Sequence, residues 1–254
     1  MAAKELYTTT LFNDPTLKLY YRFSETSGTT VNDSSTGGHN GTASRTNILN
    51  NSGGVFGNKG VFERASTDRV TITDHADLKP TSGGFTVGGW IKRAAASGVE
   101  EMIFTSWNGL SSVYAGILLS INPNGTIRIA SCKNTGLTQG TDWQAASSAT
   151  AITDTTTFHL VIGVWDGSQL KVYIDGSPDG TPVNWANAPA YKATNYVRLG
   201  DFVNQTGSEA DSFGGSVDDF FLFNGKALSP TEISNYYNGL LASRFGGSFL
   251  LNFI

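Results

Sequence analysis

The stretch FHLVIGVWDGSQLKVYIDG, residues Phe158 to Gly176, decides the fold predicted for this chain. Two apolar-rich segments flank Asp166-Gly167-Ser168, which supplies the tight turn that a β-hairpin needs. After the turn, apolar and more polar positions alternate, which predicts one buried face and one face in water. The first face holds Leu170, Val172 and Ile174, and the second holds Lys171, Tyr173 and Asp175. A hairpin of this kind belongs to an antiparallel sheet, and two such sheets usually pack into a sandwich.

The composition argues against several classes of protein. Charged residues make up 15% of the 254 residues, below the roughly 25% of ordinary soluble proteins. The net charge is −4 and no stripe of Lys and Arg occurs, so nucleic acid is not expected as a partner. No basic amphipathic helix and no run of about 20 apolar residues occurs, so a membrane is not expected either. The start, MAAKELYTTT, lacks the apolar segment of a secretory signal peptide, which predicts synthesis in a cytosol without export by the general route.

We expect one all-β domain, a two-sheet antiparallel jelly-roll sandwich, at residues 17–240. A polar N-terminal arm (1–16) precedes it and an apolar tail (241–254) follows it. The single cysteine, Cys132, allows no internal disulfide and is expected to be a buried or half-buried strand residue. Residues 133–157 and 177–195 are predicted to be loops. Strands are predicted at 17–23, 29–31, 54–56, 60–63, 69–73, 85–93, 101–107, 115–121, 126–131, within 158–176, at 196–201 and at 216–223.

One short helix is well specified near the C-terminus. Ser229-Pro230-Thr231-Glu232 combines an N-cap serine, a proline at the first helical position and a glutamate at the third, which is a capping box. Gly239 then lies where a helix-ending glycine is wanted. The tail beyond it should be buried, either as an extra strand of this domain or against another chain. Its candidate docking residues are Phe249, Leu250, Leu251, Phe253 and Ile254.

Taken together, these segments resemble the laminin G-like, concanavalin A-like lectin/glucanase jelly-roll domains. The motifs that carry the resemblance are LYYRFSETSGTTVNDSSTGGHNGT (19–42), GGFTVGGWIKR (83–93), the hairpin at 158–176, VRLGD (197–201) and GGSVDDFFLFNGKALSPTEISNYYNG (214–239). The resemblance implies a mostly non-catalytic scaffold of the kind found in lectin modules and in virus and bacterial surface proteins. Such a fold alone assigns no function.

Calcium is the one cofactor with support in the sequence. Asn32-Asp33-Ser34 and His39-Asn40-Gly41 form an oxygen-rich loop, and hard cations prefer such oxygen ligands. The resemblance implies a structural Ca²⁺ between the first loop and the closing strand, which points to Asp33, Asn40 and Asp218 or Asp219. The alternative is an Asx-turn loop that is held by its own hydrogen bonds.

Aromatic residues in polar loops are the candidates for glycan binding, because the apolar face of a sugar stacks on an aromatic ring. Trp143, Trp185 and Tyr191 are such residues, with Trp107 as a weaker candidate. The alternative is that these rings pack over the edge of the sandwich.

No enzyme is predicted. Glycoside hydrolysis needs two carboxylates about 5–10 Å apart, and the adjacent pairs Glu100-Glu101 and Asp218-Asp219 should point to opposite faces of their strands. The three histidines, His39, His75 and His159, lack the spacing of a zinc site. His159 alternates with strand residues and is expected to be structural.

We therefore expect a structural or adhesion protein on the outside of a virus particle, for example a bacteriophage capsid decoration protein or fibre component. The terminal arms would dock to other virion proteins, such as major capsid or tail proteins, and to sister subunits. The sandwich would face outward and bind host surface glycans weakly. The alternative is a carbohydrate-binding lectin module of a cell.

Overall fold

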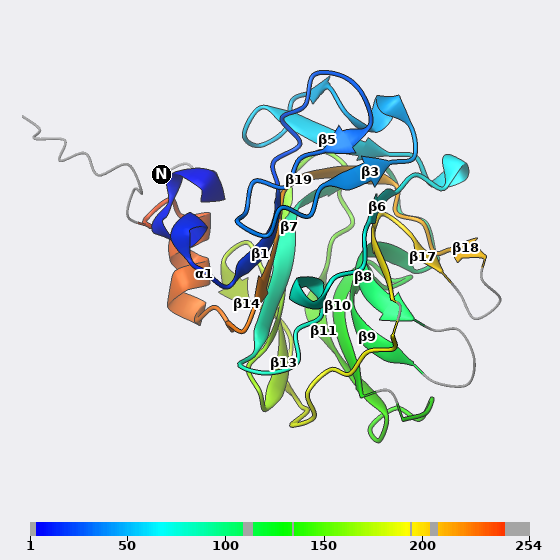
Figure 1. Cartoon of the computed structure of the whole chain (residues 1–254), viewed down its shortest axis with the longest axis vertical. Helices are drawn as coiled ribbons and strands as arrows, with labels where there is room; N and C mark the ends of the chain where they lie inside the picture. Colours follow the sequence, from blue (N-terminus) through cyan, green and yellow to red (C-terminus); the bar gives the residue numbers. More distant parts are fainter. Residues whose placement is uncertain (1–3, 109–113, 134, 194, 204–207, 242–254) are drawn as a thin grey trace, which may run out of the picture.

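The structure is a computed structural model of the 254-residue chain. It describes residues 4–108, 114–133, 135–193, 195–203 and 208–241. Two antiparallel sheets face each other across a shared core (Figure 1). This arrangement confirms the predicted all-β sandwich.

The nine-stranded sheet forms one layer. In spatial order it contains β14 (Ser177–Pro178), β13 (Gln169–Ile174), β12 (His159–Trp165), β7 (Phe85–Arg93), β19 (Gly215–Asn224), β5 (Asn58–Phe62) and β4 (Asn51–Ser52). Two strands lie off this path: β1 (Leu17–Tyr21) pairs with β19, and β15 (Val183–Asn184) pairs with β13. The predicted hairpin is therefore the β12–β13 pair, in which Trp165 lies opposite Leu170.

The eight-stranded sheet forms the other layer. Its order is β11 (Trp143–Ala151), β10 (Thr126–Lys133), β9 (Ala115–Ile121), β8 (Glu101–Asn108), β16 (Tyr196–Leu199), β6 (Val70–Ile72), β3 (Gly41–Ala43) and β2 (Thr30–Val31). A small ribbon of β17 (Phe202–Val203) and β18 (Glu209–Ala210) lies beside it. The short turns between strands include η3 (Thr46–Ile48), η4 (Arg64–Ser66) and η5 (Ala76–Leu78).

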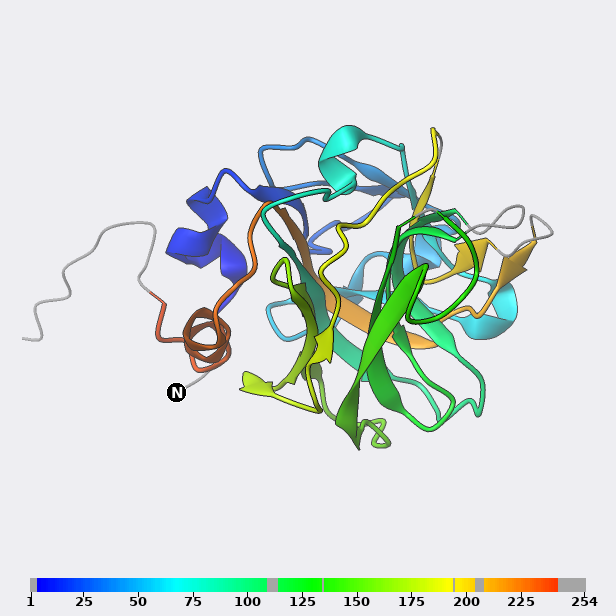
Figure 2. The same cartoon turned by 90° about the horizontal axis from the view of Figure 1, so that it is seen from below.

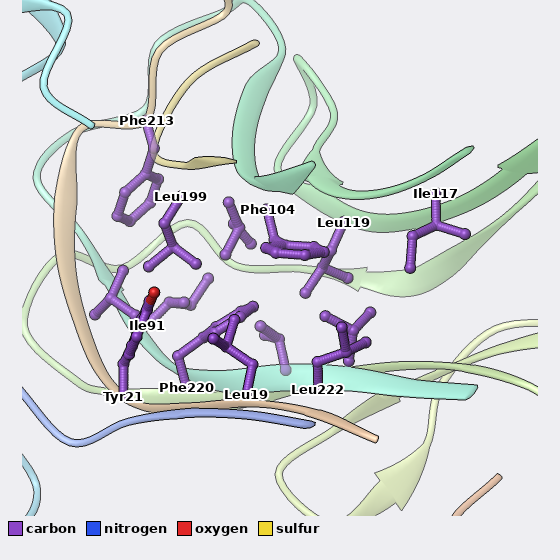
Figure 3. Close-up of a cluster of buried hydrophobic side chains, with 14 of the residues drawn as sticks. Leu19, Tyr21, Ile91, Phe104, Ile117, Leu119, Leu199, Phe213, Phe220 and Leu222 are labelled. Atoms are coloured by element: carbon purple, nitrogen blue, oxygen red, sulfur yellow. The ribbon is translucent and has the colours of Figure 1, made fainter. Parts of the chain in front are cut away.

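The main core lies between the two sheets. Figure 3 shows Leu19, Tyr21, Ile91, Phe220 and Leu222 of the nine-stranded sheet facing Phe104, Ile117, Leu119 and Leu199 of the other sheet. The layers approach so closely at β12 that a Cβ on Gly163 would lie 2.6 Å from Cδ1 of Ile129. Only glycine fits there, because such a contact is far inside van der Waals distance.

A second apolar cluster covers the outer face of the nine-stranded sheet. It is formed by the N-terminal turns η1 (Leu6–Thr8) and η2 (Thr10–Asn13), the helix α1 (Pro230–Tyr237) and side chains of β1, β7, β12 and β19. Figures 1 and 2 show the N-terminal turns and α1 side by side on this face. Leu6 and Leu11 are buried there, so this part of the N-terminal arm packs on its own sandwich.

This cluster corrects the expectation that one face of the hairpin lies in water. Tyr173 is only 3% exposed because it belongs to the outer cluster, although Lys171 on the same face stays partly exposed. The predicted tail residues lie outside the described residues. These are Phe249, Leu250, Leu251, Phe253 and Ile254.

Helix α1 begins as the sequence predicts. The Ser229 hydroxyl accepts the backbone N–H of Glu232 at 3.2 Å, and the Glu232 carboxylate accepts the backbone N–H of Ser229 at 2.8 Å. Ile233 and Tyr236 face the outer cluster, which anchors the helix on the sheet. No helix in the described ranges has the length and apolar character needed to cross a bilayer.

Two predicted loops contain strands. Trp143–Ala151 forms β11 at the edge of the eight-stranded sheet, and β14 and β15 lie within 177–195. The predicted strand at 54–56 is instead a bend, in which Val55 and Phe56 pack on the outer cluster. Cys132 is buried on β10, as expected, and burial raises the pKa of its thiol.

Candidate functional site

The candidate site is a pocket of about 280 Å³ on the outer face of the eight-stranded sheet. It lies over β8, β9, β10 and β11, with the β17–β18 ribbon beside it. Its floor is apolar and contains Met102, Leu118 and Ala130. Its aromatic residues are Trp107, Tyr114, Trp143 and Phe202, and its charged residues are Glu100, Arg128 and Asp211. Mostly apolar pockets with a few polar groups are the usual form of a small-molecule site.

The aromatic residues form a connected cluster around Trp107. The ring centroid of Trp107 lies 5.1 Å from that of Tyr114 and 6.3 Å from that of Phe202. Tyr114 is in turn 6.3 Å from Trp143, in an edge-to-face arrangement. The indole N–H of Trp143 donates to the backbone oxygen of Leu137 at 3.0 Å, which fixes the orientation of this ring.

The indole N–H of Trp107 has no acceptor among the described residues. The residue is only 4% exposed and lines the pocket. A buried donor that makes no hydrogen bond costs about 1–3 kcal/mol. A ligand oxygen that reached this N–H would remove that cost.

The charged residues form a linked group. Arg128 makes an ion pair with Glu100, and the hydroxyl of Ser120 donates to Glu100 at 2.8 Å. Burial and the nearby negative charge of Glu100 raise the pKa of Asp211, although Arg128 and Arg64 partly offset them. The pocket therefore offers both hydrogen-bond donors and acceptors beside its aromatic rings.

The structure separates the three predicted aromatic candidates. Trp143 lines the pocket, although it begins β11 and does not lie in a loop. Trp185 is a core residue, 3% exposed, and its indole N–H donates to Ser131 at 3.3 Å. Its prediction as a glycan platform is wrong, because the polar loop that carries it folds back into the sandwich. Tyr191 is half-buried and is not among the described residues that line this pocket.

Sequence reasoning missed most of the pocket. The alternation of Arg128, Ala130 and Cys132 along β10 does place these side chains on one face, and this signal could have been used. No local pattern points to Phe202 or Asp211, because both reach the pocket from distant segments.

The predicted calcium ligands fall into two groups. Asp33 accepts hydrogen bonds from the backbone of Tyr20, Ser35 and His39, and Asn40 accepts the backbone N–H of Asp33 at 2.8 Å. These contacts stay within residues 20–40, as in the alternative Asx-turn arrangement. Structural Ca²⁺ at this loop stays a prediction.

Asp218 and Asp219 form the second group, and they correct an expectation. A β-bulge between Asp218 and Phe221, with a left-handed φ of 48° at Asp219, turns both carboxylates toward the outer face of the nine-stranded sheet. Adjacent acids therefore share a face here, because a bulge breaks the strict alternation of a strand. The carboxylate of Asp218 accepts the backbone N–H of Phe56 at 3.0 Å, and its Oδ1 has no partner among the described residues.

Asp219 is buried and accepts hydrogen bonds from the backbone N–H of Leu6 and from the hydroxyls of Tyr20 and Tyr236. Burial raises the pKa of Asp218 to about 6 and that of Asp219 to about 7. These contacts tie the N-terminal segment and α1 to β19, which is a structural role.

The spacing of the three histidines in the sequence suggested that they are isolated from one another. The structure shows instead that two of them lie together. The rings of His39 and His75 have centroids 4.6 Å apart, and Asp77 lies beside both. His159 lies between Asp154 and Asp175, with 2.7 Å from each of its ring nitrogens to a carboxylate oxygen.

Comparison with known protein families identifies the family of this chain. The family model described as the concanavalin A-like lectin/glucanases superfamily, laminin G type 3, matches residues 64–234. No curated protein matches the chain.

Solved structures share the fold at low sequence identity. The binding domain of Paraclostridial mosquitocidal protein 1 has a TM-score of 0.64 at 10% identity, covering 88% of this chain and 52% of that one. Domain 4 of the arabinanase AbnA from Geobacillus stearothermophilus, solved with arabinotriose, has a TM-score of 0.59 at 20% identity, covering 87% and 98%. The carbohydrate-binding module of the Ruminococcus gnavus IT-sialidase, bound to α2,3-sialyllactose, has a TM-score of 0.50 at 17% identity, covering 63% and 84%.

The chain thus spans about half the length of the toxin binding domain and nearly all of the arabinanase domain. These likenesses are of fold, and the fold is a lectin-like one shared with non-catalytic carbohydrate-binding domains, some of which are parts of enzymes. The chain belongs to the concanavalin A-like lectin/glucanases superfamily, in its laminin G-like group.

Proposed function

We propose that this chain is a non-enzymatic glycan-binding module and that its site is the aromatic pocket over β8–β11. The observation that carries the proposal is the convergence of four aromatic side chains with Glu100, Arg128 and Asp211 in one pocket. The apolar face of a sugar ring can pack on aromatic rings, while its hydroxyls exchange hydrogen bonds with carboxylate and guanidinium groups.

The arrangement of the charges supports binding over hydrolysis. Two carboxylates, Glu100 and Asp211, do share the pocket, and a hydrolase would place such a pair across the scissile bond. Glu100, however, is already engaged by Arg128 and Ser120. A carboxylate held in this way serves as a fixed acceptor for sugar hydroxyls. The glycan-bound relatives of this fold support the same role.

A glycan array followed by calorimetric titration of the best ligand tests the proposal. Trp143→Ala should weaken binding by about five- to thirtyfold, because stacking on one large aromatic ring contributes on the order of 1–2 kcal/mol. Tyr237→Ala is the matched control, since Tyr237 is a half-buried aromatic residue on α1, which packs on the outer face of the opposite sheet. No ligand on the array, or equal loss in both variants, would refute the site. Release of reducing ends from the ligand would identify an enzyme instead.

We propose further that the module acts on the outside of a virus particle, as a decoration or fibre component that touches host glycans. The burial of Leu6 and Leu11 on their own sandwich leaves the apolar residues at 249–254 as the segment for docking to other virion proteins or sister subunits. Many copies on one particle would add weak glycan contacts through avidity. A lectin module of a cell is the alternative.

Mass measurement in solution tests this second proposal. The full chain should form a trimer or larger ring, and a chain that ends at Leu241 should be a monomer of unchanged fold. A full chain that is monomeric, binds no particle and behaves like the shortened chain would argue for the cellular lectin.

A further inference from the structure

We propose that His39, His75 and Asp77 form a binding site for a divalent transition-metal ion, with Zn²⁺ as its natural probe. One ligand atom from each of the three side chains lies within 4.8 Å of the other two. His39 Nε2 is 3.1 Å from Asp77 Oδ2, and His75 Nδ1 is 3.5 Å from the same oxygen. The site is separate from the glycan pocket and does not depend on the proposed function.

These distances suit a shared ion. Zinc binds imidazole nitrogen and carboxylate oxygen at about 2.0–2.2 Å, which places two ligand atoms at a tetrahedral angle about 3.4 Å apart. Both distances to Asp77 Oδ2 are close to this value. The remaining adjustment falls to His75, whose side chain is 54% exposed and has room to move.

The hydrogen bond at His75 identifies the ligand atom on this ring. His75 Nδ1 accepts the backbone N–H of Asp77 at 3.2 Å, so in the neutral ring this nitrogen carries a lone pair. The same nitrogen lies 3.5 Å from Asp77 Oδ2. An imidazole nitrogen has one such lone pair, so a metal ion bound at Nδ1 would replace the hydrogen bond from the backbone N–H of Asp77.

Two of the three ligands are held in place by the fold. The backbone N–H of His39 donates to Asp33 at 2.8 Å, and its backbone oxygen accepts the hydroxyl of Tyr21 at 2.7 Å. The His39 ring packs on the backbone of Gly37, where a Cβ would lie 2.8 Å from Cδ2 of the ring. Such support pre-positions a ligand and raises its affinity for metal.

Asp77 is anchored as well, because it lies on η5. The backbone oxygen of Asp77 accepts the side-chain amide of Asn224 at 3.0 Å, and Leu78 of the same turn is buried in the main core. An ion at this site would therefore join the loop before β3 to the turn between β6 and β7. The two segments are 38 positions apart at His39 and Asp77.

The ligand chemistry sets the class of metal. Two imidazoles and one carboxylate favour Zn²⁺, Ni²⁺ or Cu²⁺, whereas Ca²⁺ and Mg²⁺ prefer sites made only of oxygen. The site is therefore distinct from the calcium site predicted at Asp33 and Asn40. Three protein ligands also leave coordination positions for water or for a group from a partner.

Calorimetric titration of the tag-free, chelator-treated full chain with Zn²⁺ tests the proposal, with the visible absorption of Co²⁺ as a second readout of the coordination sphere. One ion should bind per chain. His75→Ala and Asp77→Asn should each weaken binding at least about tenfold. Both side chains are exposed or partly exposed, so both variants are expected to fold. His159→Gln is the matched control, because it removes the third histidine of the chain without touching the cluster.

The expected result is saturable one-to-one binding that both cluster variants lose and the control keeps, together with a Co²⁺ spectrum that shows nitrogen ligation. Absence of saturable binding up to roughly 1 mM Zn²⁺ would overturn the proposal, since such an affinity is too weak for a built site. Unchanged affinity in either cluster variant, or displacement of Zn²⁺ by an equal concentration of Ca²⁺, would overturn it as well.

Discussion

The hydroxyl of Tyr20 on β1 donates a hydrogen bond to Asp219 on β19, across 199 positions of sequence. The same buried carboxylate accepts the hydroxyl of Tyr236 on α1 and the backbone N–H of Leu6. One side chain thus joins four segments of the chain beneath the outer apolar cluster. Its protonation state should therefore influence how firmly these segments hold together.

The stability that Asp219 contributes should decline as pH rises. Burial raises its pKa to about 7, whereas an aspartate in the unfolded chain titrates near 3.9. Between these values the folded state binds more protons, so the contribution is complete below about pH 4 and is lost above about pH 7. Urea denaturation of wild type and Asp219→Asn should show that the wild-type advantage shrinks by on the order of a few kcal/mol between pH 4.5 and pH 8. A constant difference would contradict this.

Asp142→Asn provides the control for this measurement. A hydrogen bond from Thr135 lowers the pKa of Asp142, so its contribution should have the opposite dependence on pH. If both variants changed in the same direction, a general charge effect would explain the result better than the burial of Asp219.

The clamp around His159 should stabilise the fold mainly at low pH. Burial alone would lower the pKa of this histidine, but hydrogen bonds to Asp154 and Asp175 outweigh it and raise the pKa. The contribution is therefore complete below about pH 6.5 and is lost as pH rises through the folded-state pKa. His159→Gln should lower the melting temperature by roughly a few degrees at pH 5.5 and by less at pH 9. An equal loss at both pH values would show that charge has no part in the clamp.

Arg128 should matter more for ligand binding than for stability. Arg128→Gln removes the cation that pairs with Glu100. The carboxylates of Glu100 and Asp211 then remain in the pocket without the positive charge of Arg128. We expect at least about tenfold weaker glycan binding but less than about 1 kcal/mol of lost stability, since the ion pair is partly exposed. Lys133→Gln on the same strand is the control, because Lys133 is not among the described residues that line the pocket. Unchanged affinity in Arg128→Gln would remove Arg128 from the site.

Gly163 should tolerate no side chain. Gly163→Ala places a methyl group 2.6 Å from Ile129 across the two sheets, and overpacking of this kind costs about 1–3 kcal/mol. Adding Ile129→Val should recover part of the loss, because it removes the nearest of the clashing atoms. Gly214→Ala is the control, since its new Cβ would meet its nearest neighbour at an ordinary 3.4 Å. Chemical denaturation of the four proteins measures these differences, and an equal cost for both alanines would contradict the packing argument.

The local sequence pattern predicted the main strands. It failed where tertiary contacts determine the secondary structure or the direction of a side chain. The bounds of β7 and β9 match the prediction, because each is an apolar run flanked by turn residues. β11 was missed, since its sequence WQAASSATA is small and polar and only Ala146 and Ser148 are buried. The shared face of Asp218 and Asp219 was missed because alternation cannot reveal a bulge.

The binding pocket was less predictable than the fold. Trp143 could be found as an aromatic residue in polar surroundings, but the same pattern selected Trp185, which is buried between the sheets. Composition around a tryptophan does not say whether its loop faces water or folds inward. The residues of the pocket also come from strands and a ribbon whose proximity only the paired sheet creates.

The nine-stranded sheet can be completed only late in biosynthesis, because β19 follows its partner strands in the sequence. This strand pairs with β7, β1 and β5, yet a ribosome makes it after every other strand in the described part of the chain. Until residue 224 has emerged, three earlier strands have open edges that could pair with another nascent chain. Slow maturation, sensitivity to premature termination and a need for chaperones during overexpression follow from this late closure.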